Sequence, residues 1–159
     1  MSEITHNLAD RLMALGWMMA TAESCTGGLI AAQCTDVPGS SRWFERGLVT
    51  YSNSSKTDLL GVDAAVIEKH GAVSEPVARA MALGAVYRTR ARASLSVTGV
   101  AGPDGGSVEK PVGTVWFGWC IDGRVYSEHQ FFAGNRQQVR HASCAYALLG
   151  LLKRMPATP

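Results

Sequence analysis

Short apolar segments alternate with helical patterns along the first hundred residues, and this alternation limits the folds open to the chain. Buried strands are predicted at residues 17–21, 47–53 and 94–98, with helical patterns in the sequence between them. Strands separated by helices usually pair in parallel, because each helix carries the chain back across one face of the sheet. The alternation therefore predicts an α/β fold built on a parallel sheet.

The last third of the chain follows a different pattern. Residues 113–121 and 124–132 are rich in β-forming side chains and are joined by Asp122-Gly123, a dipeptide typical of tight hairpins. A helical pattern then covers residues 135–154. Three strands with helices between them, a hairpin and a final helix predict a three-layer α/β/α sandwich with a mixed sheet.

The composition argues against several classes of protein. The 159 residues are 47% hydrophobic and 18% charged, which is typical of a soluble globular protein. A net charge of +2, without a Lys/Arg cluster, argues against nucleic-acid binding. No apolar stretch approaches the roughly 20 residues of a membrane span, and the four cysteines lack C-x-x-C spacing. We therefore expect a cytoplasmic protein with reduced thiols and neither a nucleic-acid nor a membrane partner.

The sequence Ser-Cys-Thr-Gly-Gly at residues 24–28 carries the most chemical information. It stands between an apolar run and a helical pattern, which predicts a turn from strand to helix. Adjacent glycines allow a ligand to approach the backbone, and the free N–H groups of a helix start favour an anion. Ser24 and Cys25 are both candidate nucleophiles. Helix capping is an equally good local explanation for the serine.

Two other loops follow predicted parallel strands and are expected to meet the Ser24 turn at one edge of the sheet. One contains Tyr51 and Lys56, and the other is the glycine-rich segment Gly99–Gly106. No histidine lies in these loops, so Lys56 is the remaining candidate base for the Ser24 hydroxyl. The pattern alone agrees better with a surface lysine, and the glycines fit a turn-rich connection as well as a ligand contact.

Arg136 and Arg140 lie four residues apart near the start of the final helix, so they share one of its faces. Arginine side chains suit a phosphate group, although such pairs on helices are usually solvated. The four histidines and the scattered carboxylates form no pattern of metal ligands. We expect neither a metal ion nor a cofactor.

Six short motifs stand in one order along nearly the whole chain: Ala22–Gly28, Pro38–Ser41, Gly47–Lys56, Gly71–Ser74, Thr98–Gly106 and Pro111–Val115. Together they resemble the C-terminal domain of the competence-damage-inducible CinA family, the nicotinamide-nucleotide amidases. The resemblance implies an α/β/α sandwich with one antiparallel strand, so a mostly parallel five-stranded sheet is expected. It also implies a single stand-alone amidase domain over residues 1–159, because larger members carry a further N-terminal domain.

The resemblance also implies an activity, which is hydrolysis of the carboxamide of nicotinamide mononucleotide to nicotinic acid mononucleotide and ammonia in pyridine nucleotide recycling. Ser24 matches the family's nucleophile, and Tyr51 and Lys56 match the residues that assist it. Arg136 fits the family's Gly-Asp/Asn-Arg segment. The residues expected to contact the substrate are Cys25, Thr26, Gly27, Gly28, Thr98, Gly99, Gly102, Gly105, Gly106, Arg136 and Arg140.

Two alternatives to a serine amidase stay open at this point. A non-catalytic nucleotide-binding module, acting in competence or in the response to DNA damage, needs the glycine loops and arginines but has no use for Lys56. A cysteine amidase would use Cys25 and leave Ser24 as a helix cap, yet no histidine stands near the turn to activate the thiol. A small-molecule nucleotide is the expected partner, and the sequence leaves self-association open.

Overall fold

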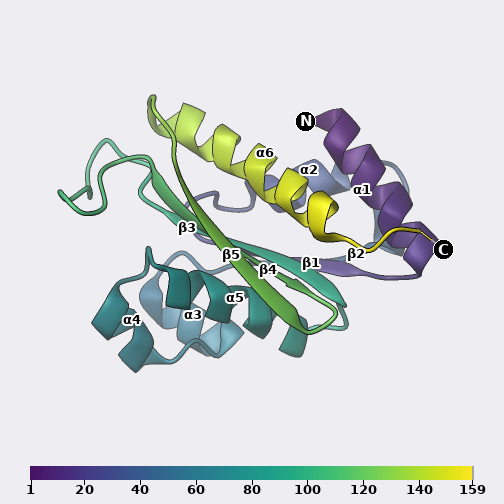
Figure 1. Ribbon diagram of the computed structural model, residues 1–159, viewed down its shortest axis with the longest axis horizontal. Coiled ribbons are helices and arrows are strands. Elements are labelled where there is room, and N and C mark those ends of the chain that lie inside the picture. Colours follow the sequence, from purple (N-terminus) through teal and green to yellow (C-terminus); the bar gives the residue numbers. More distant parts are fainter. Residues whose placement is uncertain (159) are drawn as a thin grey trace.

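The computed structural model describes residues 1–158 as a central five-stranded sheet with helices on both faces (Figure 1). In chain order the elements are α1 (Ser2–Leu15), β1 (Met19–Glu23), α2 (Leu29–Thr35), the 3-10 turn η1 (Ser40–Arg42), β2 (Phe44–Val49), α3 (Asn53–Leu60), α4 (Ala64–His70), α5 (Glu75–Tyr87), β3 (Ala93–Gly99), β4 (Thr114–Ile121), β5 (Arg124–Phe131) and α6 (Arg136–Arg154). Helices α1, α2 and α6 cover one face, and α3, α4 and α5 cover the other (Figure 1). The predicted three-layer sandwich is confirmed.

The strands lie in the order β2-β1-β3-β4-β5. β1 pairs in parallel with both β2 and β3, whereas β4 pairs antiparallel with its neighbours β3 and β5. β4 is thus the strand that runs against the others, as expected. Glu23 at the end of β1 lies opposite Val49 on one side and Val97 on the other. This register brings the segments that follow the three parallel strands to one edge of the sheet.

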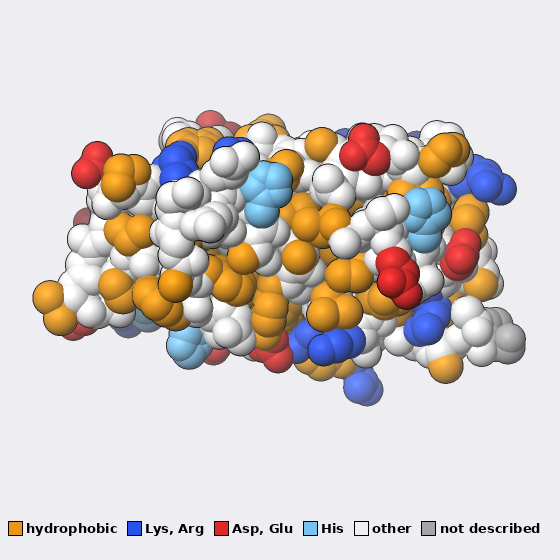
Figure 2. All heavy atoms as spheres, turned by 90° about the horizontal axis from the view of Figure 1, so that it is seen from above, with side chains coloured by type: hydrophobic (Ala, Val, Ile, Leu, Met, Phe, Trp, Pro, Cys, Tyr) orange, Lys and Arg blue, Asp and Glu red, His pale blue; other side chains and the backbone are white. Residues whose placement is uncertain are grey.

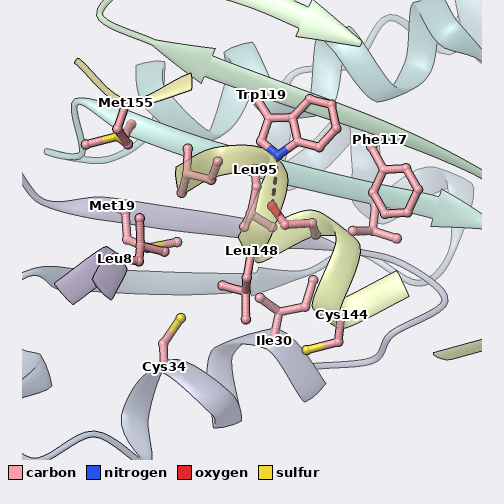
Figure 3. Close-up of a cluster of buried hydrophobic side chains, with 14 of the residues drawn as sticks. Leu8, Met19, Ile30, Cys34, Leu95, Phe117, Trp119, Cys144, Leu148 and Met155 are labelled. Carbon is pink, nitrogen blue, oxygen red and sulfur yellow. Dashed lines mark hydrogen bonds between the residues drawn. The ribbon is translucent and has the colours of Figure 1, made fainter. Parts of the chain in front are cut away.

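The core beneath α1, α2 and α6 is built from large side chains (Figure 3). Leu8, Leu95, Phe117 and Leu148 are fully buried there, and each contributes about 1.5–3 kcal/mol through burial of its apolar surface. The indole of Trp119 also lies in this layer and donates a hydrogen bond of 2.9 Å to the carbonyl of Ala147. This layer anchors α6 on the sheet.

The opposite face of the sheet carries small residues, and α5 packs very close to it. The hydroxyls of Ser94 and Ser96 donate hydrogen bonds of 2.6 Å to the carbonyls of Ala82 and Ala78 in α5. A Cβ added at Gly118 of β4 would overlap the same Ala78 carbonyl. Small side chains are therefore a requirement of this close approach.

Local signals placed the turn of the hairpin and the start of the last helix correctly. Asp122 and Gly123 have φ values of 51° and 86°, the positive angles that a tight two-residue hairpin turn requires. Asn135 caps α6 by accepting the Gln138 N–H at 2.9 Å, and the Gln138 side chain accepts the Asn135 N–H at 2.9 Å. The predictions at both positions are confirmed.

The second strand lies earlier in the chain than predicted. It spans Phe44–Val49 instead of residues 47–53, because Phe44 pairs with Met19 at the start of β1. The polar stretch after it is a helix: the Ser52 hydroxyl accepts the N–H of Ser55 at 3.1 Å and caps the first turn of α3. Lys56 therefore lies inside a helix rather than at the end of a polar loop.

The first strand also lies later than predicted, at Met19–Glu23 instead of residues 17–21, so that Glu23 is its last residue. Among residues 1–158, no helix combines the length and the apolar content needed to cross a membrane. Figure 2 shows the face that carries α1 and α6, where Lys and Arg side chains lie in several separate places among apolar and polar ones.

Candidate active site

The turn after β1 lies between the residues that follow β2 and β3. The backbone N–H of Thr50 donates to the carbonyl of Glu23 at 2.8 Å, and the N–H of Ser24 donates to the carbonyl of Val97 at 2.9 Å. The sheet ladder thus continues to Ser24 itself, which is 9% exposed. This arrangement places the Ser24 hydroxyl at the carboxyl edge of the parallel strands, where the three loops were expected to converge.

Lys56 reaches the Ser24 hydroxyl from the first turn of α3. Its Nζ lies 3.1 Å from Ser24 Oγ, 2.9 Å from the carbonyl oxygen of Thr50 and 3.3 Å from that of Tyr51. The side chain is 1% exposed. The structure therefore joins two residues 32 positions apart in the sequence, and Lys56 is not the surface lysine that its local pattern favoured.

The surroundings of Lys56 favour its neutral form. Among residues 1–158, no carboxylate lies within 4.0 Å of Lys56 Nζ to form an ion pair. Burial lowers the pKa of the Lys56 amine, because the charged form loses its hydration. Burial also raises the pKa of the neighbouring Cys25 thiol to about 11, so that this thiol is neutral at pH 7. The site thus pairs a hydroxyl with an amine that can accept a proton.

The Ser24 turn presents unpaired backbone donors. Gly27 and Gly28 have φ values of 59° and 101°, a left-handed conformation that glycine adopts without strain. The Gly27 N–H donates to the carbonyl of Ser24 at 3.0 Å. The N–H groups of Cys25, Thr26 and Gly28 have no acceptor among residues 1–158. These free donors beside the hydroxyl are suited to an oxyanion.

Glu23 belongs to the site and was missed from the sequence. Its fully buried carboxylate accepts the N–H groups of Ile30 and Ala31 at 2.9 and 3.0 Å. The start of α2 is therefore not open to an anionic ligand, and the prediction of an anion site there is wrong. The capping explanation for Ser24 is also wrong, because Gly28 is the N-cap residue of α2. An acid just before a helix start is the signal that could have identified Glu23.

The two arginines of α6 both lie at the site but make different contacts. Arg140 donates from Nε to the carbonyl of Cys25 and from Nη2 to that of Thr26, both at 3.1 Å. Arg136 donates from Nη1 to the carbonyl of Gly102 at 2.7 Å and from Nη2 to the Tyr51 hydroxyl at 2.8 Å. One arginine thus holds the backbone of the nucleophile turn, and the other joins two loops at its rim.

The Tyr51 side chain points toward solvent. It is 58% exposed, and its hydroxyl accepts the hydrogen bond from Arg136. Within residues 1–158 no hydrogen bond connects this hydroxyl with Ser24 or Lys56, and Tyr51 contacts Lys56 through its backbone carbonyl. Of the two ways in which Tyr51 could assist Ser24, relaying its proton or holding the lysine, a relay through the phenol has no hydrogen-bonded path here, whereas the backbone carbonyl of Tyr51 does contact Lys56.

The glycine-rich loop after β3 is less closely connected to the Ser24 turn than Lys56 and Arg140 are. Thr98 donates its hydroxyl proton to the carbonyl of Ala72 at 2.9 Å. Gly105 and Gly106 are exposed, and in the described part of the chain no hydrogen bond joins them to the turn. A Cβ on Gly106 would lie 2.8 Å from the backbone nitrogen of Val112, so close packing within the loop explains this glycine. Figure 1 shows the loop projecting beyond the end of the sheet.

The donor set at this edge of the sheet does not resemble a metal site. Across residues 1–158, no three His, Cys, Asp or Glu side chains are arranged to hold a metal ion. The acid nearest the turn, Glu23, is already bound to the backbone of α2.

Comparisons with known proteins agree with this architecture. The chain matches the family model described as the CinA C-terminal domain over residues 1–155. Two curated relatives are named nicotinamide-nucleotide amidohydrolase PncC. The one from Enterobacter agglomerans is 51% identical over 152 residues, which cover 95% of this chain and 93% of the relative. The one from Pseudomonas putida is 51% identical over 146 residues, which cover 92% of this chain and 91% of the relative.

A solved structure has the same fold. The competence damage-inducible protein A (ComA) of Klebsiella pneumoniae subsp. pneumoniae MGH 78578 superposes with a TM-score of 0.93 and 37% sequence identity, over 96% of this chain and 95% of that one. With a family match over nearly its whole length and relatives that share half of its residues, this chain belongs to the CinA C-terminal domain family.

Proposed function

We propose that this protein hydrolyses the carboxamide of nicotinamide mononucleotide, giving nicotinic acid mononucleotide and ammonia. The proposal is carried by one observation, the 3.1 Å contact between the buried Lys56 amine and the Ser24 hydroxyl. A serine attacks an amide only when a base takes its proton. A buried lysine that has no carboxylate partner suits that task. The names of the PncC relatives support the substrate.

In the proposed first step, neutral Lys56 acts as the base. Its two N–H groups donate to the carbonyls of Thr50 and Tyr51, which leaves its lone pair for the hydroxyl proton of Ser24. Ser24 Oγ then forms a bond to the amide carbon while the proton moves to Lys56. The negative charge on the amide oxygen is stabilised by the free backbone N–H groups of the turn.

The second half of the reaction returns the enzyme to its starting state. Protonated Lys56 gives its proton to the amide nitrogen, the C–N bond breaks, and ammonia leaves an ester on Ser24. Water then attacks the ester carbon while Lys56 takes a proton from the water. The bond to Ser24 Oγ breaks, Lys56 returns the proton to that oxygen, and the carboxylic acid product leaves and gives its own proton to the solvent. Ser24 and Lys56 are therefore assigned as catalytic residues.

We assign recognition of the nucleotide to the rim of the site. Arg136 is exposed and keeps further N–H donors beyond its two hydrogen bonds, so it is the proposed phosphate ligand. Because Arg140 already binds two carbonyls, it is a weaker candidate for that role. The exposed ring of Tyr51 offers a face to the cationic pyridinium. The substrate contacts proposed for the remaining loop are those of its backbone at Thr98, Gly99, Gly102, Gly105 and Gly106.

The alternatives fit the site less well. A cysteine nucleophile needs a thiolate, but the Cys25 thiol is buried and its pKa is raised to about 11. A purely regulatory nucleotide-binding module gives no reason to bury a lysine against a serine hydroxyl, because burying an unpaired amine costs stability. The serine amidase is therefore the function that the geometry supports best.

The proposal is tested by an assay of ammonia release from nicotinamide mononucleotide. We expect the wild-type protein to release one ammonia for each nicotinic acid mononucleotide, with both products quantified in the same sample. Nicotinamide riboside and free nicotinamide, which lack the phosphate, should be poorer substrates. A folded wild-type protein that releases no ammonia from the mononucleotide would refute the proposal.

A further inference from the structure

We propose that Arg140 is a positioning residue for the amidase reaction, and that it acts through the peptide groups of the Ser24 turn that bind the oxyanion. The inference deepens the proposed function and rests on it. The position of Arg140 on α6 beside Arg136 first suggested that it binds the phosphate. The inference gives Arg140 a different role.

Arg140 contacts the carbonyl end of one peptide group of the Ser24 turn. The Cys25 carbonyl, which accepts the hydrogen bond from Arg140 Nε, belongs to the same peptide group as the N–H of Thr26. In a trans peptide the carbonyl and the N–H point in opposite directions. Arg140 therefore holds the carbonyl end of this peptide, and the Thr26 N–H points away from the guanidinium with no acceptor among residues 1–158.

The backbone of the Ser24 turn needs a support from outside the turn. Glycine has the greatest backbone freedom of all residue types. The turn contains two glycines, Gly27 and Gly28, and both take positive φ values here. Within the turn, the Gly27 N–H bonds the Ser24 carbonyl and the Leu29 N–H bonds the Thr26 carbonyl, each at 3.0 Å. Downstream of the turn, Glu23 fixes the start of α2. The Cys25 carbonyl has no donor other than Arg140 among the described residues.

The positive charge of Arg140 strengthens its effect on the turn. Hydrogen bonds from a guanidinium are about twice as strong as neutral ones, and they polarise the peptide group that accepts them. A polarised peptide is a better donor at its N–H end, where the negative charge of the transition state develops. Because a guanidinium does not lose its proton, this effect persists at every pH at which Lys56 is neutral.

The decisive experiment compares Arg140→Ala and Arg140→Lys with the matched control Arg154→Gln. Arg154 lies on the same helix and also donates to a carbonyl, that of Gly150, but its other partner is Glu128 in β5. With nicotinamide mononucleotide, Arg140→Ala should lower kcat about 10- to 100-fold and change KM less than about threefold. Arg140→Lys, which keeps the positive charge but lacks the planar donor fork of the guanidinium, should be intermediate. Arg154→Gln should keep the wild-type kcat.

A second substrate separates positioning from phosphate binding. If Arg140 acts through the turn, kcat/KM for nicotinamide riboside should fall by the same factor as that for the mononucleotide. Guanidinium chloride at millimolar concentration should partly restore kcat in Arg140→Ala and have no such effect on Arg154→Gln. A loss confined to the mononucleotide and expressed in KM would show instead that Arg140 binds the phosphate. A wild-type kcat in Arg140→Ala would also overturn the inference.

A structural readout keeps this test independent of turnover. Amide hydrogen exchange at Gly27 and Leu29 reports the two hydrogen bonds inside the turn. We expect faster exchange at both amides in Arg140→Ala and unchanged exchange in Arg154→Gln. Unchanged exchange in Arg140→Ala would overturn the positioning role. If the wild-type protein proved inactive, the proposed function would fail while this measurement would still decide whether Arg140 holds the turn.

Discussion

Two basic side chains approach the Ser24 turn from opposite faces of the sheet, and they differ in what they contact. Lys56, from α3, reaches the hydroxyl oxygen of Ser24 itself, whereas Arg140, from α6, reaches only backbone carbonyls. Burial lowers the pKa of the Lys56 amine, so this side chain can exist without charge, while a guanidinium cannot. In the proposed reaction, a proton acceptor and a fixed positive charge are therefore needed at different places around Ser24.

The helices that carry these two basic side chains also rest on different kinds of packing. α3 is held by the close approach of α5, where a Cβ added to Gly84 would overlap the carbonyl of Leu60. α6 lies instead on the core of large side chains shown in Figure 3. A small residue thus allows the close approach of α5 to the helix that carries the lysine, and bulky apolar side chains anchor the helix that carries the arginine.

The largest effect is expected from removing the hydroxyl that Lys56 contacts. Ser24→Ala should lower kcat at least about 1000-fold and leave binding of the mononucleotide largely intact, because only the nucleophile is lost. Cys25→Ala keeps the backbone donors of the turn and should retain most of the activity. Kinetics and calorimetric binding measured on both variants test this. An active Ser24→Ala together with an inactive Cys25→Ala would reverse the assignment of the nucleophile.

The next largest effect tests whether Lys56 must be able to lose its proton. Lys56→Arg preserves a positive charge but cannot act as a base, and should lower kcat about 100- to 10,000-fold. In the wild type, kcat/KM should rise with pH as Lys56 deprotonates through its lowered pKa. The measurement is a pH–rate profile for both proteins. Near wild-type kcat in Lys56→Arg would mean that another group takes the proton.

A smaller effect is expected at the rim, where Arg136 contrasts with Arg140 on the same helix. Arg136→Ala should raise KM for nicotinamide mononucleotide by roughly 10- to 150-fold, which corresponds to about 1.5–3 kcal/mol for a lost charge-assisted bond. It should have little effect on nicotinamide riboside, which has no phosphate. Steady-state kinetics with both substrates make the comparison. Equal losses with the two substrates would remove the phosphate role from Arg136.

The smallest effect concerns the pH dependence of stability, which should distinguish Lys56 from Arg140 without any assay of activity. The pKa of Lys56 is lower in the folded protein than in the unfolded chain. At pH values between these two pKa values, the unfolded chain therefore binds more protons than the folded protein. The contribution of Lys56 to the free energy of unfolding then rises with pH. This gain in stability stops growing near the ordinary lysine pKa of about 10.4. It is lost as the pH falls through the folded pKa. Lys56→Met should lack this contribution, and Arg140→Met should keep it.

Urea unfolding of the wild type and both variants at several pH values between neutrality and pH 10 measures these slopes. The buried thiols titrate in the opposite sense, since burial raises their pKa, but all three proteins share them. The difference between the wild type and Lys56→Met therefore reports mainly the lysine, because burial has the largest influence on the pKa of Cys25 and Lys56 the smallest of those acting on it. Parallel curves for these two proteins would contradict a lowered pKa.

Much of the fold is determined by signals that act between near neighbours in the sequence. Asp122-Gly123 requires a tight turn wherever it stands between two strands, and Asn135 with Gln138 forms a capping box from local contacts alone. The alternation of strands and helices limited the architecture to layers around a mixed sheet. The order of the motifs was enough to identify the family and the serine on which the proposed reaction depends.

The contacts of the site were decided by tertiary structure. Whether Lys56 is a surface lysine or lies against Ser24 depends on the order and register of β1 and β2, which no local pattern contains. Arg136 and Arg140 lie on the same face of α6. Their different contacts follow from how α6 lies over the sheet. The sequence by itself specified which residues are present and which local turns they form. Contacts over long sequence separations, and the loss of water that shifts a pKa, exist only once the layers have packed.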